Sequence, residues 1–186
     1  DHGAEDGGPG GTSGERPRVS ARGVMPEPQN GSDPSQSWTI LRLVLWSAEY
    51  LGDKGIETGR LDAEWLLASA LGMDRLQLYL QHDRPLDPDE RHAFKQLLRR
   101  RAGREPLQYI LGRAAFRELE LVADPRALIP RPETEILVEE VLAWATDRAV
   151  GLGRVMDVGT GTGAVSVSLA VEGMCTRILA TDISEG

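Results

Sequence analysis

The sequence predicts an α/β protein in which a small helical bundle precedes an open, mostly parallel α/β domain. Apolar residues recur with helical spacing between residues 37 and 105, and turn signals with alternating apolar residues follow at 106–127. In residues 128–186 short apolar runs alternate with helical segments. Residues 1–36 are rich in glycine and proline and almost lack large apolar side chains, so we expect a disordered leader there.

The first predicted helix begins after Ser37, which can serve as its N-cap. Apolar residues then recur every three or four positions, which indicates one face turned toward a core. The residues assigned to that face are Trp38, Leu41, Leu45, Ala48 and Leu51.

Three further helices complete the predicted bundle, at residues 61–71, 74–81 and 87–103. The last has the strongest signals, because Asp87 can cap it, Pro88 suits the first helical position, and Glu90 stands where a capping-box acid reaches back. A bundle of this size buries little surface alone and gains stability by docking on a neighbour.

Residues 106–127 break the helical period. Phe116, Leu119 and Leu121 alternate imperfectly with charged residues, and Asp124 followed by proline marks a turn. We predict a β-hairpin linker between the two domains.

The domain at residues 128–186 has the pattern of a parallel α/β fold. The expected elements are a helix at 132–144, a strand at 154–158, a helix at 164–171 and a strand at 177–181. Both strands are short, mostly apolar and free of proline, as a sheet covered on both faces requires. The strand–helix–strand unit is complete, but the sequence ends before later strands, so we expect this domain to be incomplete.

Composition limits the classes of function. The formal net charge of −8 argues against holding nucleic acid by bulk attraction, so we expect no stable nucleic-acid binding. The single cysteine excludes an intrachain disulfide, and the three histidines show no ligand spacing, so no metal is expected. The sequence has no apolar run of the roughly 20 residues that cross a bilayer and no signal peptide, which favours a cytoplasmic location without a membrane partner.

A glycine-rich turn carries the main chemical signal. Residues 159–163 read Gly-Thr-Gly-Thr-Gly, follow a predicted strand and open a predicted helix. Glycine lets the backbone turn sharply and approach a bound group, and a helix N-terminus offers N–H groups to a carboxylate or phosphate. On this pattern alone, a tight turn without a ligand stays open.

Two acidic residues make the turn more specific. Asp182 ends the next strand, where a carboxylate can accept hydrogen bonds from ribose hydroxyls or serve as an ordinary turn residue. Asp157 lies inside the preceding strand, where a charge is costly unless a polar or cationic group, such as the ammonium of a methionine moiety, meets it. A dinucleotide site needs G-x-G-x-x-G, whereas this turn has G-x-G-x-G, so the sequence favours S-adenosyl-L-methionine as cofactor and a truncated Rossmann-like (class I) methyltransferase domain.

Two strings upstream of the turn extend this interpretation: residues 105–112 read Glu-Pro-Leu-Gln-Tyr-Ile-Leu-Gly, and 128–135 read Leu-Ile-Pro-Arg-Pro-Glu-Thr-Glu. Together with the turn they resemble the HemK/PrmC family of release-factor glutamine methyltransferases, over roughly residues 38–184. The resemblance implies methylation of the glutamine side-chain amide in the Gly-Gly-Gln motif of peptide chain release factors. It also implies that the helical domain at residues 37–105 recognises the substrate.

The resemblance implies a set of cofactor-binding residues as well. The glycine turn would surround the methionine part, Asp182 would hold the ribose, and residues 131–133 would lie beside the site, although a proline-led helix start explains these three equally well. The expected cofactor-binding residues are Arg131, Pro132, Glu133, Asp157, Gly159, Thr160, Gly161, Thr162, Gly163 and Asp182. The family's amide-gripping Asn-Pro-Pro-Tyr motif does not occur in these 186 residues, so no catalytic residue is assigned.

Two alternatives stay open. Related domains methylate amines of nucleic-acid bases, and residues 84–117 hold nine Lys or Arg against four Asp or Glu, although such a run is usually a solvated face. The second alternative is a non-catalytic fragment that only docks a protein partner. We expect this chain by itself neither to bind the cofactor tightly nor to transfer methyl groups, because its sheet would keep an unpaired edge.

Overall fold

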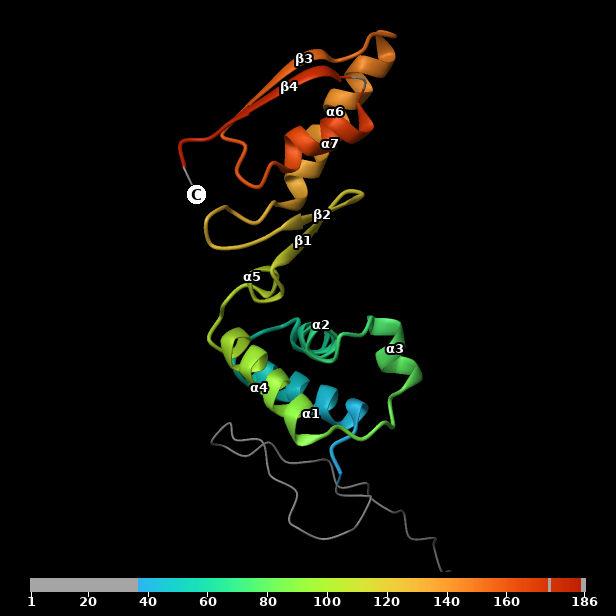
Figure 1. Cartoon of the computed structure of the whole chain (residues 1–186), viewed down its shortest axis with the longest axis vertical. Helices are drawn as coiled ribbons and strands as arrows, with labels where there is room; N and C mark the ends of the chain where they lie inside the picture. The colour runs from blue at the N-terminus through green and yellow to red at the C-terminus, as the bar shows by residue number, and fades with distance from the viewer. Residues whose placement is uncertain (1–36, 174, 185–186) are drawn as a thin grey trace, which may run out of the picture.

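The computed structural model describes residues 37–173 and 175–184, and the leader expected at residues 1–36 lies outside them. Helices make up the N-terminal part of the described chain, and short sheets follow after Gly112 (Figure 1). Each part has its own cluster of buried apolar side chains. The protein is therefore a mixed α/β chain with N-terminal helices and short sheets.

Four helices form the N-terminal part: α1 (Ile40–Asp53), α2 (Gly59–Leu71), α3 (Arg75–Leu80) and α4 (Pro88–Ala102). The start of α4 confirms the predicted capping box. Asp87 Oδ1 accepts a hydrogen bond from Glu90 N at 2.8 Å, and Glu90 Oε2 accepts one from Asp87 N at 3.1 Å. Two backbone donors that a helix start leaves unpaired are thereby satisfied.

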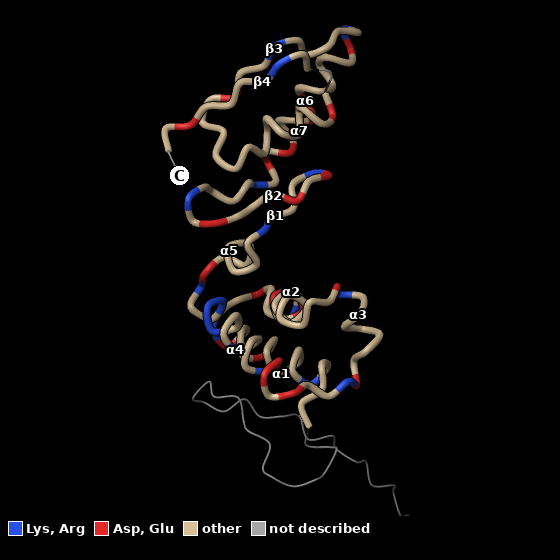
Figure 2. Tube along the Cα trace, viewed as in Figure 1, with Lys and Arg blue, Asp and Glu red and all other residues tan. Residues whose placement is uncertain are grey.

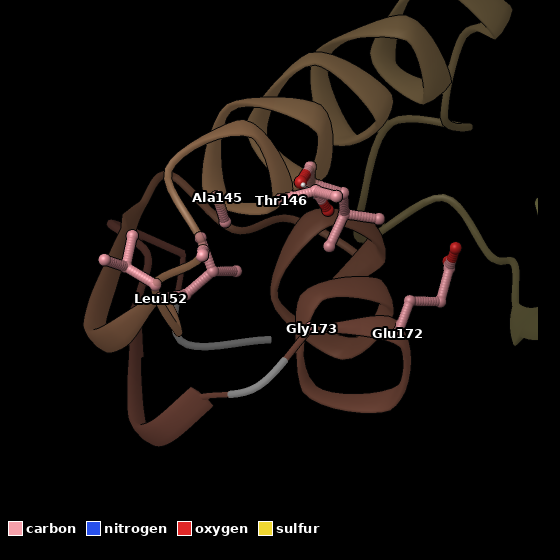
Figure 3. A pocket seen from close by; sticks show the side chains of 8 residues that line it. Ala145, Thr146, Leu152, Glu172 and Gly173 are labelled. Carbon is pink, nitrogen blue, oxygen red and sulfur yellow. Dashed lines mark hydrogen bonds between the residues drawn. The ribbon is translucent and has the colours of Figure 1, made fainter.

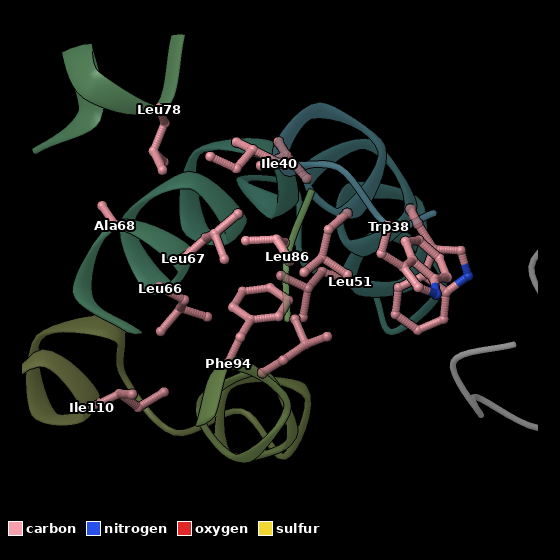
Figure 4. Packing of buried hydrophobic residues seen from close by; sticks show 14 of the residues in the cluster. Trp38, Ile40, Leu51, Leu66, Leu67, Ala68, Leu78, Leu86, Phe94 and Ile110 are labelled. Atoms are coloured by element: carbon pink, nitrogen blue, oxygen red, sulfur yellow. The ribbon is translucent and has the colours of Figure 1, made fainter. Parts of the chain in front are cut away.

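Apolar side chains from α1, α2 and α4 share one core. Figure 4 shows the Phe94 ring of α4 pointing between Leu66 of α2 and Leu51 of α1, and all three side chains are fully buried. Each such side chain contributes about 1.5–3 kcal/mol through burial. This core, and not helix propensity alone, holds the helices together.

The predicted start and inward face of α1 are partly wrong. The N-cap is Thr39, whose hydroxyl accepts a hydrogen bond from the backbone N–H three residues on, and not Ser37. Leu41 and Leu45 are 41% and 44% exposed, although Trp38 and Leu51 are buried as expected. Because α1 is apolar on most of its circumference, spacing alone could not select the buried face. The buried residues within α1 are Ile40, Leu43, Val44, Trp46, Ser47 and Leu51.

A short helix and a hairpin join the two parts. The helix α5 (Leu107–Leu111), which the sequence did not predict, buries Ile110 against the helical core. Strand β1 (Arg113–Phe116) then pairs antiparallel with β2 (Leu119–Val122). The hairpin is therefore shorter than the segment predicted for it, because the first residues belong to the helical part.

The C-terminal part contains α6 (Pro132–Asp147), β3 (Gly153–Val158), α7 (Ala164–Glu172) and β4 (Cys175–Thr181), in the predicted order. The two strands are parallel neighbours, with Met156 opposite Leu179. Helices α6 and α7 pack on one face of this sheet (Figure 1). Met156 and Leu179 on the other face are 61% and 51% exposed, so one face of the described sheet is covered.

Candidate cofactor-binding site

The glycine turn connects the end of β3 to the start of α7, at the carboxyl edge of the sheet. Gly159, Gly161 and Gly163 have φ values of 78°, 53° and 78°, in the left-handed region that L side chains rarely adopt. A Cβ at Gly159 or Gly161 would meet no atom within 4 Å. The backbone conformation, and not a lack of space, therefore requires glycine at these two positions.

The turn uses its own N–H groups to attach itself to β4. Gly159 N and Thr160 N donate to Thr181 O at 2.8 and 3.0 Å. Gly161 N donates to Asp182 Oδ2 at 2.8 Å. Three consecutive backbone donors of the turn thus have partners within the chain.

Asp182 follows β4 and lies beside the turn. Besides the bond from Gly161, its Oδ1 accepts a hydrogen bond from Ser184 N at 2.9 Å. These backbone hydrogen bonds, from Ser184 and then Gly161, hold the pKa of Asp182 below its usual value. The carboxylate is therefore charged at neutral pH, and it is exposed, so its remaining lone pairs are open to hydroxyl donors.

Asp157 is half-buried in β3 and finds its polar partner within the chain. Thr160 Oγ1 donates to Asp157 Oδ2 at 2.7 Å and lies 3.1 Å from Ser166 Oγ. Ser166 Oγ in turn donates to Gly163 O at 3.1 Å. The Thr160 hydroxyl thus gives one oxygen of this carboxylate a partner within the chain, and contact with a cofactor ammonium stays a prediction for Asp157.

A cavity of about 330 Å³ lies between the glycine turn and the segment that follows β2. Its lining from the C-terminal part is Thr160, Gly161, Thr162, Asp182 and Ser184, and from the other side Val122, Asp124, Arg126 and Ala127. The sequence predicted the turn residues and Asp182 as one site, and the structure brings them together. For the segment after β2 the sequence predicted only a turn, with no place in the site.

Asp124 and Arg126 form an ion pair at this cavity. Arg126 Nε and Nη2 donate to the two oxygens of Asp124 at 2.9 and 2.6 Å, and Arg126 N donates to Oδ1 at 2.9 Å. The hydrogen bonds from the Arg126 side chain and backbone lower the pKa of Asp124 to about 2. Tyr109 Oη donates to Ala127 O at 2.9 Å and holds the end of the segment.

The hairpin reaches the C-terminal part through Arg117. Its guanidinium Nε and Nη2 donate to the Glu172 carboxylate of α7 at 2.8 and 2.6 Å. Its backbone N donates to Glu135 Oε1 of α6 at 3.1 Å. With φ at 51°, Arg117 adopts a conformation that is uncommon outside glycine, and these contacts hold it there. The clamp fixes β2, and hence the segment after it, against α6 and α7.

Comparison with known proteins agrees with the earlier resemblance. Residues 42–112 match the family model of the PrmC N-terminal domain. A protein named release factor glutamine methyltransferase from Geobacter sulfurreducens is 43% identical over 155 residues, which is 83% of this chain and 53% of that protein. The chain is thus similar to the HemK/PrmC family over most of its length.

Two further HemK/PrmC relatives with the same name show similar coverage. The protein from Chlorobaculum tepidum is 40% identical over 79% of this chain and 51% of its own length. The protein from Rhodopirellula baltica is 39% identical over 79% of this chain and 50% of its own length. The chain thus spans about half the length of the curated relatives that it matches.

Three predicted cofactor-binding residues of the segment shared with the HemK/PrmC family, at positions 131–133, do not line this cavity. Arg131, Pro132 and Glu133 are exposed at the start of α6, and none of them lines the cavity. Pro132 is the first helical residue, with Glu133 and Glu135 in the first turn, as helix geometry and the helix dipole favour. The structure accounts for the three residues as a helix start, and contact with a cofactor stays a prediction.

A second cavity, of about 380 Å³, lies where α6 and α7 end and β3 begins (Figure 3). Its lining is mostly apolar: Leu142, Ala145, Thr146, Ala149, Val150, Leu152, Glu172 and Gly173. Ligands of open α/β sheets bind outside the carboxyl ends of the strands, and this cavity lies at the opposite edge. We therefore assign no ligand to it.

The described part of the chain contains neither a cluster of metal-ligating side chains nor a helix that could span a membrane. In residues 37–173 and 175–184 no three His, Cys, Asp or Glu side chains are placed to hold one metal ion. Cys175 carries a free thiol, whose Sγ donates to Leu169 O at 3.2 Å. Over the same residues no helix has the length and apolar character that crossing a bilayer requires.

Proposed function

We propose that this protein methylates the glutamine side-chain amide in the Gly-Gly-Gln motif of peptide chain release factors, with S-adenosyl-L-methionine as methyl donor. The observation that carries the proposal is the similarity to release factor glutamine methyltransferases over 79% to 83% of the chain. Since this chain spans about half of those relatives, the activity is proposed for the whole enzyme. We propose a Rossmann-like fold for the catalytic domain. We also propose a cytoplasmic location for the enzyme, because a chain with a single cysteine forms no internal disulfide of the kind common in secreted proteins.

The residues around the first cavity suit this donor. The exposed, charged carboxylate of Asp182 can accept the ribose hydroxyl hydrogens, and the turn at residues 159–163 lets the backbone approach the methionine end. The cavity lining holds two carboxylates and one guanidinium, which suits a ligand with a net positive charge. When bound, the donor supplies an electrophilic methyl group on a sulfonium sulfur.

The work of this chain in the reaction is to bind and orient the donor. An amide nitrogen is a poor nucleophile, so the rate must come from holding it in line with the methyl group and from electrostatic stabilisation. Asp182 and the turn would fix the donor at one end of that line. No described residue is assigned to grip the amide.

The charges at residues 84–117, in α4 and the hairpin, argue against a nucleic-acid substrate. Five of the nine cations between residues 84 and 117 are in ion pairs: Arg84 with Glu90, Arg100 with Glu105, Arg101 with Asp62, Arg113 with Glu120 and Arg117 with Glu172. Acidic residues are interspersed with the basic ones along the trace (Figure 2). Binding nucleic acid through phosphates needs several unpaired cations on one surface, and the pairing removes most of them.

We further propose that the helical part recognises the release factor through α3. Leu76, Tyr79 and Leu80 of this helix are 65%, 49% and 74% exposed, although their neighbour Leu78 is buried. Exposed apolar side chains on a short helix mark a contact surface better than isolated ones do. Replacing Leu76 and Leu80 by serine should weaken capture of a release factor while leaving the denaturation midpoint unchanged, and unchanged capture would contradict this role.

The proposed reaction can be tested in a chimera. Residues 37–184 would replace the matching half of the Geobacter sulfurreducens relative, and labelled donor would be offered with release factor and total RNA in parallel. We expect label in the release factor, at the Gly-Gly-Gln glutamine by mass spectrometry. The matched Asp182→Ala chimera should lose the activity while keeping its helical content by circular dichroism. Labelled RNA with unlabelled release factor would overturn the proposal.

A further inference from the structure

One cation faces the glycine turn across the cavity. Among the described residues that line it, Arg126 is the one basic side chain, beside Asp124 and Asp182. Arg126 comes from the segment after β2, and the Arg117 clamp and the Tyr109 bond to Ala127 hold that segment in place. An arginine at a cavity wall can form charge-assisted hydrogen bonds with an anionic group of the ligand.

The backbone of the glycine turn is a poor source of such a partner's hydrogen bonds. The N–H groups of Gly159 and Thr160 bind Thr181 O, and that of Gly161 binds Asp182. With these three N–H groups taken, a carboxylate at the methionine end of the cofactor would gain from a hydrogen-bond donor on another element. Arg126 is the charged candidate on the opposite wall.

Arg126 has N–H groups left for this contact. A guanidinium carries five of them, and the Asp124 carboxylate takes the Nε and one Nη2 hydrogen. Three remain, and the side chain is 65% exposed, so a ligand can reach the guanidinium. Asp124, charged down to about pH 2, fixes one edge of the guanidinium and leaves the other edge open.

We propose that Arg126 binds the α-carboxylate of the donor's methionine end, and that Asp124 positions it. This inference rests on the proposed function, because it takes S-adenosyl-L-methionine as the ligand. A guanidinium and a carboxylate form short, charge-assisted hydrogen bonds of defined geometry. The pair would make the linker between the two parts of the chain a wall of the cofactor site, and the donor would bridge that wall and the sheet.

The test compares two ligands that differ at the amino-acid end. S-adenosylhomocysteine has the carboxylate, whereas methylthioadenosine shares the nucleoside and lacks the amino-acid end. Dissociation constants are measured by NMR titration of the full 186-residue protein with each ligand, at ligand concentrations up to the millimolar range. Arg126→Ala should weaken S-adenosylhomocysteine about tenfold and leave methylthioadenosine unchanged. Asp124→Asn should give a smaller loss with the same selectivity.

A matched control removes the same charge elsewhere. Arg148 ends α6 near the second cavity, and its guanidinium lies over Trp144. Arg148→Ala should change neither affinity, and circular dichroism checks that each variant keeps its helices. Arg126→Lys keeps the charge but not the fork of donors, so it should recover only part of the loss.

The outcomes separate the inference from the proposed function. If the unchanged protein binds both ligands and Arg126→Ala weakens both equally or neither, the carboxylate contact is wrong and the cofactor assignment stands. If the unchanged protein binds neither ligand at millimolar concentration, the cofactor assignment for this chain fails and the inference fails with it.

Discussion

The glycine turn allows one perturbation that isolates backbone conformation from packing. Gly161 has φ at 53°, and a Cβ there would meet no atom within 4 Å. Gly161→Ala therefore adds no clash, and its entire effect comes from forcing an L side chain into the left-handed region.

The expected magnitude follows from that conformation. A left-handed backbone costs an L residue about 1–2 kcal/mol, which is roughly a 5- to 30-fold change in an equilibrium constant. The cost can take two forms. If the turn keeps its shape, the C-terminal part is less stable and unfolds locally more often. If the turn relaxes, Gly161 N loses its hydrogen bond to Asp182, and the affinity for S-adenosyl-L-methionine falls instead.

Two companion variants serve as controls. Gly161→Asn should lose less than alanine, because asparagine tolerates the left-handed region. Gly52→Ala lies in α1, where an added Cβ also meets nothing, and φ there is not in the left-handed region. That substitution should stabilise the protein by about 0.5–1 kcal/mol, as expected within a helix.

Amide hydrogen exchange is the suitable assay, because it reports opening of β3 and β4 separately from the helical part. We expect exchange in these strands to be about 5- to 30-fold faster in Gly161→Ala, or nucleoside binding to weaken by a comparable factor. If both quantities match those of the unchanged protein, the left-handed turn is not a requirement at this position, and the argument for glycine fails.

Three further predictions concern charged side chains. Asp62→Ala should lower the unfolding free energy by about 3 kcal/mol in urea denaturation, because the guanidinium of Arg101, only 17% exposed, loses its carboxylate partner; a loss typical of surface pairs would contradict this. Arg117→Ala should speed amide exchange in β2, because the hairpin loses its hydrogen bonds to Glu172, and unchanged exchange there would show that the hairpin needs no clamp. The pKa of Asp124 is lowered to about 2, so the stability contributed by its pair with Arg126 is present above its ordinary pKa of 3.8 and is lost as pH falls through about 2; an NMR titration of the carboxyl carbon with a midpoint near 3.8 would refute this.

Local chemistry made part of this structure predictable. The start of α4 followed from Asp87, Pro88 and Glu90, because a capping box is completed within one helical turn. The glycine turn followed from its place between a strand and a helix, and Asp182 from its place at the next strand end. Parallel strands bring their carboxyl ends to one edge, so these two features had to meet.

Other features depended on contacts between distant residues. The buried face of α1 could not be chosen by spacing, since Leu41 and Leu45 are as apolar as the residues that are buried. The helix α5 is five residues long, too short for its spacing to predict it, and its Ile110 packs against the helical core. The place of Arg126 at the cavity depends on the Arg117 clamp, which joins residues 55 positions apart in the chain.

Asp157 and Asp182 differ in how strongly each supports a bound ligand, because one lies within a strand and the other follows a strand end. The sequence predicts that Asp157 needs a polar or cationic partner, and the Thr160 hydroxyl provides a polar one within the turn, so this charge does not by itself require a ligand. Asp182 is also bonded, to Gly161 N and Ser184 N, but those bonds lower its pKa and leave an exposed carboxylate with further acceptor capacity. The bond to the half-buried Asp157 weakens the case for a ligand there, whereas the bonds to Asp182 orient an exposed, charged carboxylate that can still accept hydrogen bonds. The case for a nucleoside at this edge of the sheet therefore rests on Asp182 and the left-handed glycines, and only secondarily on Asp157.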